Sequence, residues 1–193
     1  MKNKQGSCLA GTLVIIGIVL VVLLIPVFIY NSIVSKDEGI DAAWAQVETV
    51  LQRRYDLIPN LVNTVKGFAA QEKEVFTEVT ALRSQWAKAG SVAEKAKSAT
   101  MLEAALGKLM VISERYPELK SNQNFLRLQD ELAGTENRVS VERRRYNKAV
   151  RKYNVSIRKF PGKLIADSFG FEERDVYFRA ESEASTVPVV DFQ

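Results

Sequence analysis

The 193-residue chain contains no histidine and a single cysteine, Cys8. Without histidine, the side chain that titrates nearest to neutral pH is missing, and so are the Ser-His-Asp arrangement and the ordinary zinc site. A lone cysteine excludes an internal disulfide. The glycines are scattered and form no phosphate-binding loop of the G-x-x-x-x-G-K kind. These absences favour a protein that is not an enzyme, and we expect no cofactor and no metal ion.

Charge is missing from one long run, CLAGTLVIIGIVLVVLLIPVFIY, at residues 8–30. As a helix rising about 1.5 Å per residue it would be roughly 35 Å long, against about 30 Å for the hydrocarbon core of a bilayer. A buried core helix and a cleaved signal peptide are the alternatives. The apolar region of a signal peptide usually has about 7–15 residues and ends in an A-x-A-like site, which is absent here. We expect a short flank at residues 1–7 and a retained transmembrane signal anchor at 8–30.

Basic residues near this run are few. Lys2, Lys4 and the terminal amine precede it, and Lys36 follows it together with Asp37 and Glu38. The positive-inside rule therefore predicts a cytoplasmic N-terminus and a soluble domain on the outer side of the membrane. Removing Lys2 and Lys4 from the 27 basic residues leaves 25 against 23 acidic ones, so we expect no nucleic acid partner.

Apolar stripes with alternating steps of three and four residues follow the anchor. Such stripes predict helices that pack at coiled-coil crossing angles. They extend over residues 40–86, 92 to about 115, and about 122–160, with a capping box at Ser91 where the second begins. Short connections make neighbouring helices antiparallel. The predicted fold is all-α, an N-terminal transmembrane helix followed by an antiparallel bundle of three to four long helices at 31–160.

Pro59 lies inside the first stripe. In a helix interior proline removes one hydrogen bond and its ring crowds a carbonyl, at a cost of about 3 kcal/mol. A break is one outcome, with Asp56 as the N-cap of a restarted helix. Because the stripe stays in register on both sides of Pro59, we expect a continuous helix that is kinked there, with Gly67 as a second weak point.

Arg54 interrupts the same stripe. A buried arginine without a partner is too costly to keep, so its guanidinium should meet a carboxylate or reach solvent. We expect Glu142 to be its partner, with Asp56 or Glu136 as substitutes and Asn60 extending a buried polar network. The alternative is that Arg54 extends along its own methylene groups to the surface. A network of this kind would fix helix register rather than catalyse a reaction.

A strongly basic segment, ERRRYNKAVRKYNVSIRKF, occupies residues 142–160. Its aromatic residues fall on the apolar stripe, so they belong to the core before they could stack on bases. A solvated basic face is the default interpretation. Binding to anionic lipid head groups is the better functional alternative, ahead of nucleic acid. The candidate contacts with an anionic surface are Arg144, Arg145, Lys148, Arg151 and Lys152.

Residues 161–193 depart from the bundle pattern. FPG at 160–162 ends the third helix, and KLIADSFGFEERDVYF at 163–178 predicts a short helix or hook packed on the bundle. The polar segment RAESEAS should be mobile. The apolar segment VPVVDF at 187–192 either packs back on its own domain or offers an extended strand to the sheet edge of a partner. We expect an irregular C-terminal hook and a mobile tail.

Two segments of the chain resemble the LemA family. They are YNSIVSKDEGIDAAWAQVETVLQRRYDLIPNLVNTVKGFAAQEKE and ELAGTENRVSVERRRYNKAVRKYNVSIRKFPGKLIADSFGF, within about residues 30–180. RRYDLIPNLV together with TENR, ERRRYN, YN and FP carries the resemblance. The family plan of one N-terminal span and a helical bundle agrees with the interpretation of the residues. Gln71 stands where histidine is common in the family, so any role built on that histidine fails here.

The resemblance implies a bacterial, membrane-anchored protein, and descriptions of the family differ on which side of the membrane the bundle faces. Combined with the positive-inside rule, the expectation is a single-pass protein of the cytoplasmic (inner) membrane with its soluble domain on the outer or periplasmic side. Family analogy adds other envelope proteins as partners, among them a membrane protease or a TPM-domain protein. We expect a non-enzymatic interaction or scaffold module that also associates with itself. A sensor or ligand-binding ectodomain that signals through a membrane partner is the alternative. An enzyme built on Arg54 and Glu142 is a third hypothesis.

Overall fold

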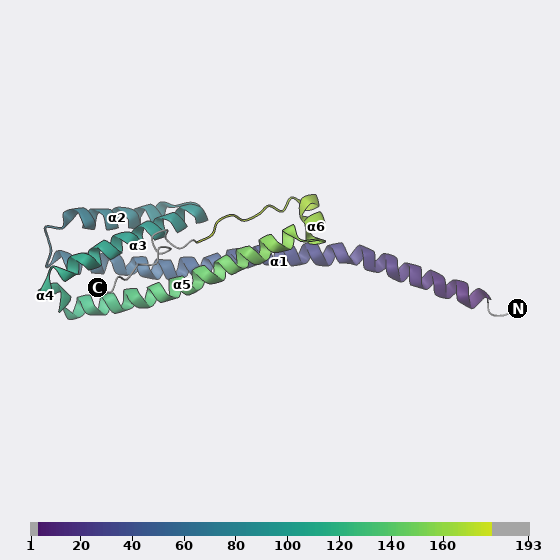
Figure 1. The fold of residues 1–193 in the computed structure, drawn as a ribbon, viewed down its shortest axis with the longest axis horizontal. Helices are drawn as coiled ribbons and strands as arrows, with labels where there is room; N and C mark the ends of the chain where they lie inside the picture. The colour runs from purple at the N-terminus through teal and green to yellow at the C-terminus, as the bar shows by residue number, and fades with distance from the viewer. Residues whose placement is uncertain (1–3, 179–193) are drawn as a thin grey trace, which may run out of the picture. The chain divides into compact units, whose positions relative to one another are not determined.

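The computed structural model describes residues 4–178 and contains helices but no strand in that range (Figure 1). Residues 171–178 are extended without regular secondary structure. The all-α prediction is confirmed. In chain order the helices are α1 (Lys4–Lys66), α2 (Lys73–Lys88), α3 (Val92–Glu114), α4 (Pro117–Lys120), α5 (Gln123–Arg158) and α6 (Gly162–Phe169).

The chain forms two compact units, as far as it is described. Of the described residues, the first unit comprises 4–41 and 148–175, and the second comprises 42–147 and 176–178. The beginning of α1 and the end of α5 thus belong to the first unit, together with α6. The rest of α1 and α5 belongs to the second, which also holds α2, α3 and α4. The expectations for RAESEAS and VPVVDF fall outside the described residues.

The N-terminal part of α1 is long and apolar enough to cross a membrane, and none of that stretch is buried inside the structure. Its large side chains are open to the surroundings, from Leu13 through Leu20 to Phe28. Apolar side chains exposed all round a helix suit a lipid environment, where every backbone group is satisfied within the helix. This stretch is a candidate transmembrane helix, as predicted.

α1 continues through Pro59, so a restart of the helix at Asp56 is wrong. Proline cannot donate to the carbonyl of Tyr55 four residues earlier. Another donor reaches that carbonyl, because Nε of Arg83 on α2 lies 3.3 Å from the Tyr55 oxygen. The neighbouring helix therefore replaces the hydrogen bond that proline removes.

The expectation that one helix continues to residue 86 is wrong. α1 ends at Lys66, turns occupy residues 67–72, and α2 begins at Lys73. Glycine lowers helix propensity by about 1 kcal/mol relative to alanine, which favours an end at Gly67. The amide of Ala69 still donates to the Val65 carbonyl, and Ala69 is fully buried. The apolar spacing passes through this turn in phase, so periodicity alone could not reveal it.

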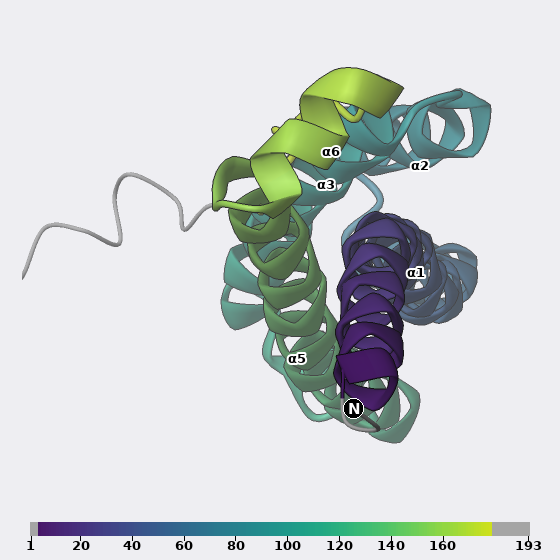
Figure 2. The same ribbon diagram turned by 90° about the vertical axis from the view of Figure 1, so that its right-hand side faces the viewer.

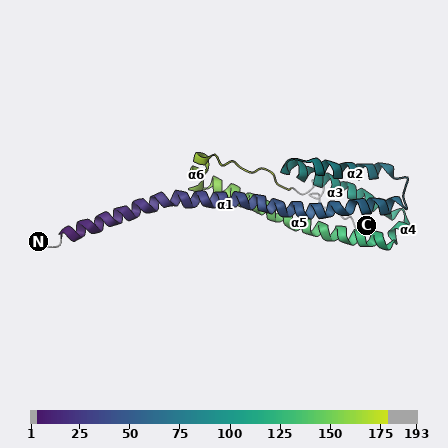
Figure 3. The same ribbon diagram turned by 180° about the vertical axis from the view of Figure 1, so that it is seen from behind.

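In the second unit, α2 and α3 lie side by side and run in opposite directions (Figures 1 and 3). The predicted capping box between them is present, since the Glu94 amide donates to Oγ of Ser91 and the Ser91 amide donates to the Glu94 carboxylate, each at 3.2 Å. With α1 and α5 they complete four long helices around one core. Its fully buried members include Val47, Leu51, Leu61, Val65, Val79, Leu102, Leu109 and Val139.

In the first unit, α6 folds across the C-terminal end of α5 (Figure 2). Gly162 permits this turn, because a Cβ atom there would lie 2.0 Å from the Ser156 carbonyl oxygen. α6 buries Gly162 and Ala166 and ends at Gly170, whose φ of 73° is the left-handed conformation that glycine adopts freely. α6 is the short helix expected within residues 163–178.

Candidate functional site

Arg54 faces α5 across the second unit. The rings of Trp44 and Tyr146 lie 5.7 Å apart and show the level at which the antiparallel helices meet. Arg54 lies ten residues after Trp44 on α1, and Glu136 lies ten residues before Tyr146 on α5. The two side chains form an ion pair. The side chain of Arg54 is 11% exposed, so the guanidinium stays in the contact instead of extending to the surface.

Glu142, the expected partner of Arg54, is not its partner. Its carboxylate pairs with Arg145 on the same helix at 2.7 Å. The register explains this, because Glu142 lies six residues from Glu136, roughly 9 Å along the helix. A helical stripe shows which side of α5 faces α1, but not which level of one helix meets which level of the other.

A second ion pair lies beside the first. Arg143 on α5 pairs with Glu103 on α3 at 3.0 Å. Burial lowers the pKa of Arg54, while the nearby Glu103 raises it and Arg143 lowers it further. We call Arg54, Glu103, Glu136 and Arg143 the interhelical charge cluster. Two cations and two carboxylates compensate one another there, which is what partly buried charges need.

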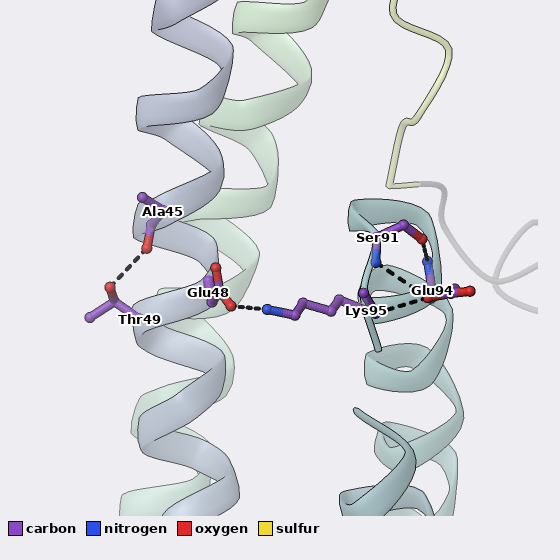
Figure 4. A network of polar contacts seen from close by, with 7 residues as sticks. Ala45, Glu48, Thr49, Ser91, Glu94 and Lys95 are labelled. Carbon is purple, nitrogen blue, oxygen red and sulfur yellow. Dashed lines mark hydrogen bonds and ion pairs between the residues drawn. The ribbon is translucent and has the colours of Figure 1, made fainter. Parts of the chain in front are cut away.

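Tyr55 and Trp86 pack next to this cluster, with ring centroids 4.1 Å apart. The Tyr55 hydroxyl and the Trp86 ring nitrogen are buried, and neither has a hydrogen-bond partner within residues 4–178. Burial raises the pKa of Tyr55. Lys95 on α3 lies 5.5 Å from the Trp86 ring and pairs with Glu48 on α1 (Figure 4). Charged and aromatic contacts thus join α1, α2 and α3.

Two other predicted members of the network lie outside it. Asp56 is exposed and accepts a 2.8 Å hydrogen bond from Gln52, one turn earlier on α1. Asn60 is also exposed and lines an open groove with Asn124 and Glu131. Their inclusion in a buried network is wrong, because both side chains are exposed.

The basic residues proposed as lipid contacts are all exposed. Arg144 and Arg145 belong to the second unit, and Lys148, Arg151 and Lys152 to the first. Arg145 is engaged by Glu142. Binding of an anionic surface by these residues stays a prediction.

In the first unit, α5 holds the extended segment that follows α6. The Asn154 side-chain amide donates to the Arg174 carbonyl at 2.7 Å, and the Arg174 amide donates back to Oδ1 of Asn154 at 3.0 Å. The Tyr153 hydroxyl donates to the Glu172 carbonyl at 2.9 Å. The Arg174 side chain pairs with Asp37 on α1 at 2.9 Å.

The same exchange recurs in the second unit. Asn147 donates to the Phe178 carbonyl at 2.8 Å and accepts from the Phe178 amide at 3.0 Å. The Phe178 ring stacks on Trp44 at 6.0 Å, and the Arg143 guanidinium lies 5.1 Å from it. We call these the Asn154 clamp and the Asn147 clamp. Sequence reasoning missed both, although each asparagine directly follows a tyrosine of the apolar stripe.

The interhelical charge cluster is therefore a set of mutual pairs that ties three helices together. None of its four members lines the open grooves of this unit. Among the described residues, no three His, Cys, Asp or Glu side chains gather as metal ligands would. That such a network fixes the helix register stays a prediction.

The model of the LemA family matches residues 43–192. This chain belongs to the LemA family. The matched range includes Arg54 and Tyr55, and also the TENR and ERRRYN motifs, from which Glu136, Arg143 and Asn147 come. The LemA-family motifs therefore supply much of the polar contact between the helices of the second unit.

The LemA-family chain is also similar to proteins that are named magnetosome proteins. "Magnetosome protein MamQ 2" and "Magnetosome protein MamQ 1" of Paramagnetospirillum magneticum are each 27% identical to it, over 97% of this chain and 79% of theirs. "Magnetosome protein MamQ" of Magnetospirillum gryphiswaldense is 27% identical over 83% of this chain and 68% of its own.

Proposed function

We propose that this LemA-family protein is a non-enzymatic, single-pass membrane protein of the bacterial envelope. Its helical bundle binds other envelope proteins and further copies of itself. The candidate span of α1 supports the membrane anchor. The pairing of the interhelical charge cluster supports a structural use of its ionisable groups. The observation that carries the binding role is an open groove along α2.

This groove, the α2 groove, encloses about 720 Å³. A second hollow of about 630 Å³ shares Ala81 and Ser84 with it and continues toward α3. The buried side of α2 holds Phe76, Val79, Leu82 and Trp86, and only Phe76 of these also reaches the groove. Apart from Phe76, small side chains dominate the floor, namely Ala70, Thr77, Thr80, Ala81, Ser84, Ala89 and Ser98.

The charge of the α2 groove indicates the partner. Lys66 and Lys73 line it. Lys88 and Lys97 line the adjoining hollow, where the single carboxylate is that of Glu94, which is engaged in the capping box. Small side chains allow a second helix to approach closely, and lysines at the rim attract carboxylates. An acidic helical segment is therefore the occupant that suits this surface best. The exposed apolar side chains of Met101 and Val111 on α3 add a surface for self-association.

Site-specific photo-crosslinking in cells tests the binding role. A photoreactive residue at Thr80, on the groove floor, should capture an acidic helical segment of an envelope protein, whereas one at Asn137 on α5 should not. Lys73→Glu with Lys88→Glu should abolish the capture, and the matched pair Lys148→Glu with Lys152→Glu should preserve it. If Thr80 captures nothing and native mass spectrometry of the full chain in micelles shows monomers only, the proposal fails.

The bundle is proposed to lie on the periplasmic side of the cytoplasmic membrane, because Lys2, Lys4 and the terminal amine precede the span and only Lys36 follows it closely. Val111 is 67% exposed, which makes it a good labelling site. In a Cys8→Ser background, Val111→Cys should react with a membrane-impermeant maleimide on cells whose outer membrane alone is permeabilised. Reaction only after lysis of the inner membrane would place the bundle in the cytoplasm.

A ligand-binding ectodomain is the second candidate function. The 720 Å³ of the α2 groove is within the range of small-molecule sites, about 300–1,000 Å³. An acidic small molecule that binds there should raise the melting temperature of the full chain in a concentration-dependent way. Lys66→Glu with Lys73→Glu should remove that effect, and an unchanged shift in the variant would exclude this site.

A further inference from the structure

A second groove lies in the first unit, where α1 passes the turn between α5 and α6. It encloses about 300 Å³ and has two chemically different ends. Phe28, Ile29 and Phe160 form an apolar end. Lys36 and Lys159, with the hydroxyls of Ser32 and Ser156, form a polar end. We call it the span-end groove, because Phe28 and Ile29 lie at the end of the predicted span at residues 8–30.

The turn beside this groove exposes the side chains that a water-soluble domain would bury. Phe160 is 82% exposed and Phe169 is 63% exposed, while α6 buries Gly162 and Ala166. Phe28 on α1 is 70% exposed. Such a concentration of exposed aromatic surface marks a contact with another apolar phase.

These aromatic residues lie at one level of α1. Phe160 lines the groove with Phe28, and the Phe169 ring lies 4.8 Å from the Tyr30 ring. Phe28 and Tyr30 are two residues apart, which is about 3 Å along a helix. Aromatic side chains gather at the head-group level of a bilayer, where a predominantly apolar span ends.

Lys36 and Lys159 form no ion pair in the described chain, and Lys36 has hydrogen-bond donors left. Lys36 donates one hydrogen bond to Ser32 at 2.7 Å, which leaves two of its three donors. Within the described chain no carboxylate forms an ion pair with Lys36 or Lys159, and the nearby Asp37 is engaged by Arg174. An unpaired pair of lysines above an apolar wall matches a molecule with an anionic head and a hydrocarbon body.

We propose that the span-end groove binds an anionic phospholipid of the bilayer that α1 crosses. Lys36 and Lys159 contact the phosphate, and Phe28 and Phe160 lie along the acyl chains. The inference rests on the proposed membrane span. It also makes the turn between α5 and α6 a second membrane contact besides α1, seated at the head-group level by Phe160 and Phe169.

Lipid retention tests the site with the full chain in mild detergent. Native mass spectrometry counts the phosphatidylglycerol and phosphatidylcholine molecules retained from an equimolar mixture. Wild type should retain phosphatidylglycerol preferentially, and Lys36→Gln with Lys159→Gln should lower that preference at least about fivefold. Lys148→Gln with Lys152→Gln removes the same charge from the exposed basic residues of the same unit and should preserve the preference.

Three results would overturn the assignment. If the Lys148 and Lys152 pair carries the preference instead, the lipid binds the basic face of α5. If excess inorganic phosphate displaces phosphatidylglycerol, the site recognises free phosphate and not a lipid. If wild type shows no preference, no anionic lipid site exists. Circular dichroism of both double variants establishes that they fold.

Depth measurements separate this inference from the span on which it rests. Spin labels on single cysteines in a Cys8→Ser background report access to oxygen, which enriches in lipid, and to a nickel chelate, which stays in water. In vesicles, labels at Leu20 and Phe160 should both favour oxygen, and a label at Val111 should favour the chelate. A lipid-like Leu20 with a water-like Phe160 contradicts the groove proposal alone. A water-like Leu20 contradicts the span and the groove proposal together.

Discussion

Arg83 donates a hydrogen bond from its Nε to the backbone carbonyl of Tyr55, over 3.3 Å and from a different helix. The donor that would normally serve this carbonyl belongs to residue 59, which is proline. The Arg83 side chain thereby allows α1 to contain a proline in its interior. The same hydrogen bond also fixes α2 against α1.

Arg83→Leu should destabilise the protein by about 1–2 kcal/mol, because a partly buried carbonyl loses its donor. The loss should shrink in a Pro59→Ala background, where the alanine amide serves the Tyr55 carbonyl. Chemical unfolding of the full chain in micelles, followed by circular dichroism, measures both effects. Equal losses in the two backgrounds would show that Arg83 stabilises the protein in some other way.

Glu136→Gln should destabilise the bundle by about 1–2 kcal/mol. The value is below the 3–5 kcal/mol typical of a fully buried pair, since the Glu136 side chain is 35% exposed. Glu142→Gln is the matched control and should change the free energy of unfolding by less than about 0.5 kcal/mol, as a local pair on one helix. A larger loss for Glu142 than for Glu136 would show that the register differs from the one described.

Replacing both members of the Arg54–Glu136 pair by leucine should recover part of the stability that is lost when Arg54 alone is replaced. In Arg54→Leu with Glu136→Leu, the buried and the partly buried charge disappear together, so neither is left without a partner. The double variant should be more stable than Arg54→Leu alone. A double-mutant cycle on the same unfolding measurement gives the coupling, and a coupling near zero would contradict the ion pair.

Gly162→Ala should destabilise the first unit by about 1–3 kcal/mol, since the new methyl group meets the Ser156 carbonyl oxygen at 2.0 Å and the backbone must move. Gly134→Ala in α5 is the control. A Cβ atom at Gly134 meets nothing within 4 Å, so alanine should stabilise the helix by up to about 1 kcal/mol. Thermal unfolding of the two variants should therefore shift in opposite directions, and shifts of the same sign would contradict the close approach of α6.

Alkaline pH should weaken the fold through Tyr55. Burial raises its pKa above the ordinary value of 10.0, so the folded chain holds the phenolic proton more tightly than the unfolded chain. That contribution is intact below pH 10 and is lost as the pH rises beyond it, by up to about 1.4 kcal/mol per pH unit. Burial also raises the pKa of Tyr153, so Tyr153 contributes in the same direction.

Tyr55→Phe should therefore lose less stability than wild type between pH 9 and pH 11, roughly the range around the ordinary tyrosine pKa. Lysine deprotonation affects both proteins alike and cancels in the difference. Unfolding in micelles at a series of pH values measures the slope. Parallel curves for the two proteins would show that the Tyr55 hydroxyl is accessible to water in the folded state.

Apolar spacing predicted the helices well, because burial of one side governs where a helix can exist. It predicted the candidate span, the Ser91 capping box and the limits of α3 and α5 to within about two residues. It missed the turn at residues 67–72, because apolar residues on both sides of Gly67 keep the same phase whether the backbone continues or reverses.

The candidate site was less predictable because it depends on register and on distant chain segments. Arg54 stood out as a cation on an apolar stripe, but the level at which α1 meets α5 decides between Glu136 and Glu142. Arg143 looked like one cation among many in a basic segment. Asn154 makes its contacts with the backbone of residue 174, and no side-chain pattern records a partner of that kind.

The Asn154 and Asn147 clamps use neutral amides, which neither gain nor lose a proton across the physiological range. The backbone attachment of residues 174 and 178 to α5 therefore does not depend on the charge of any ionisable side chain.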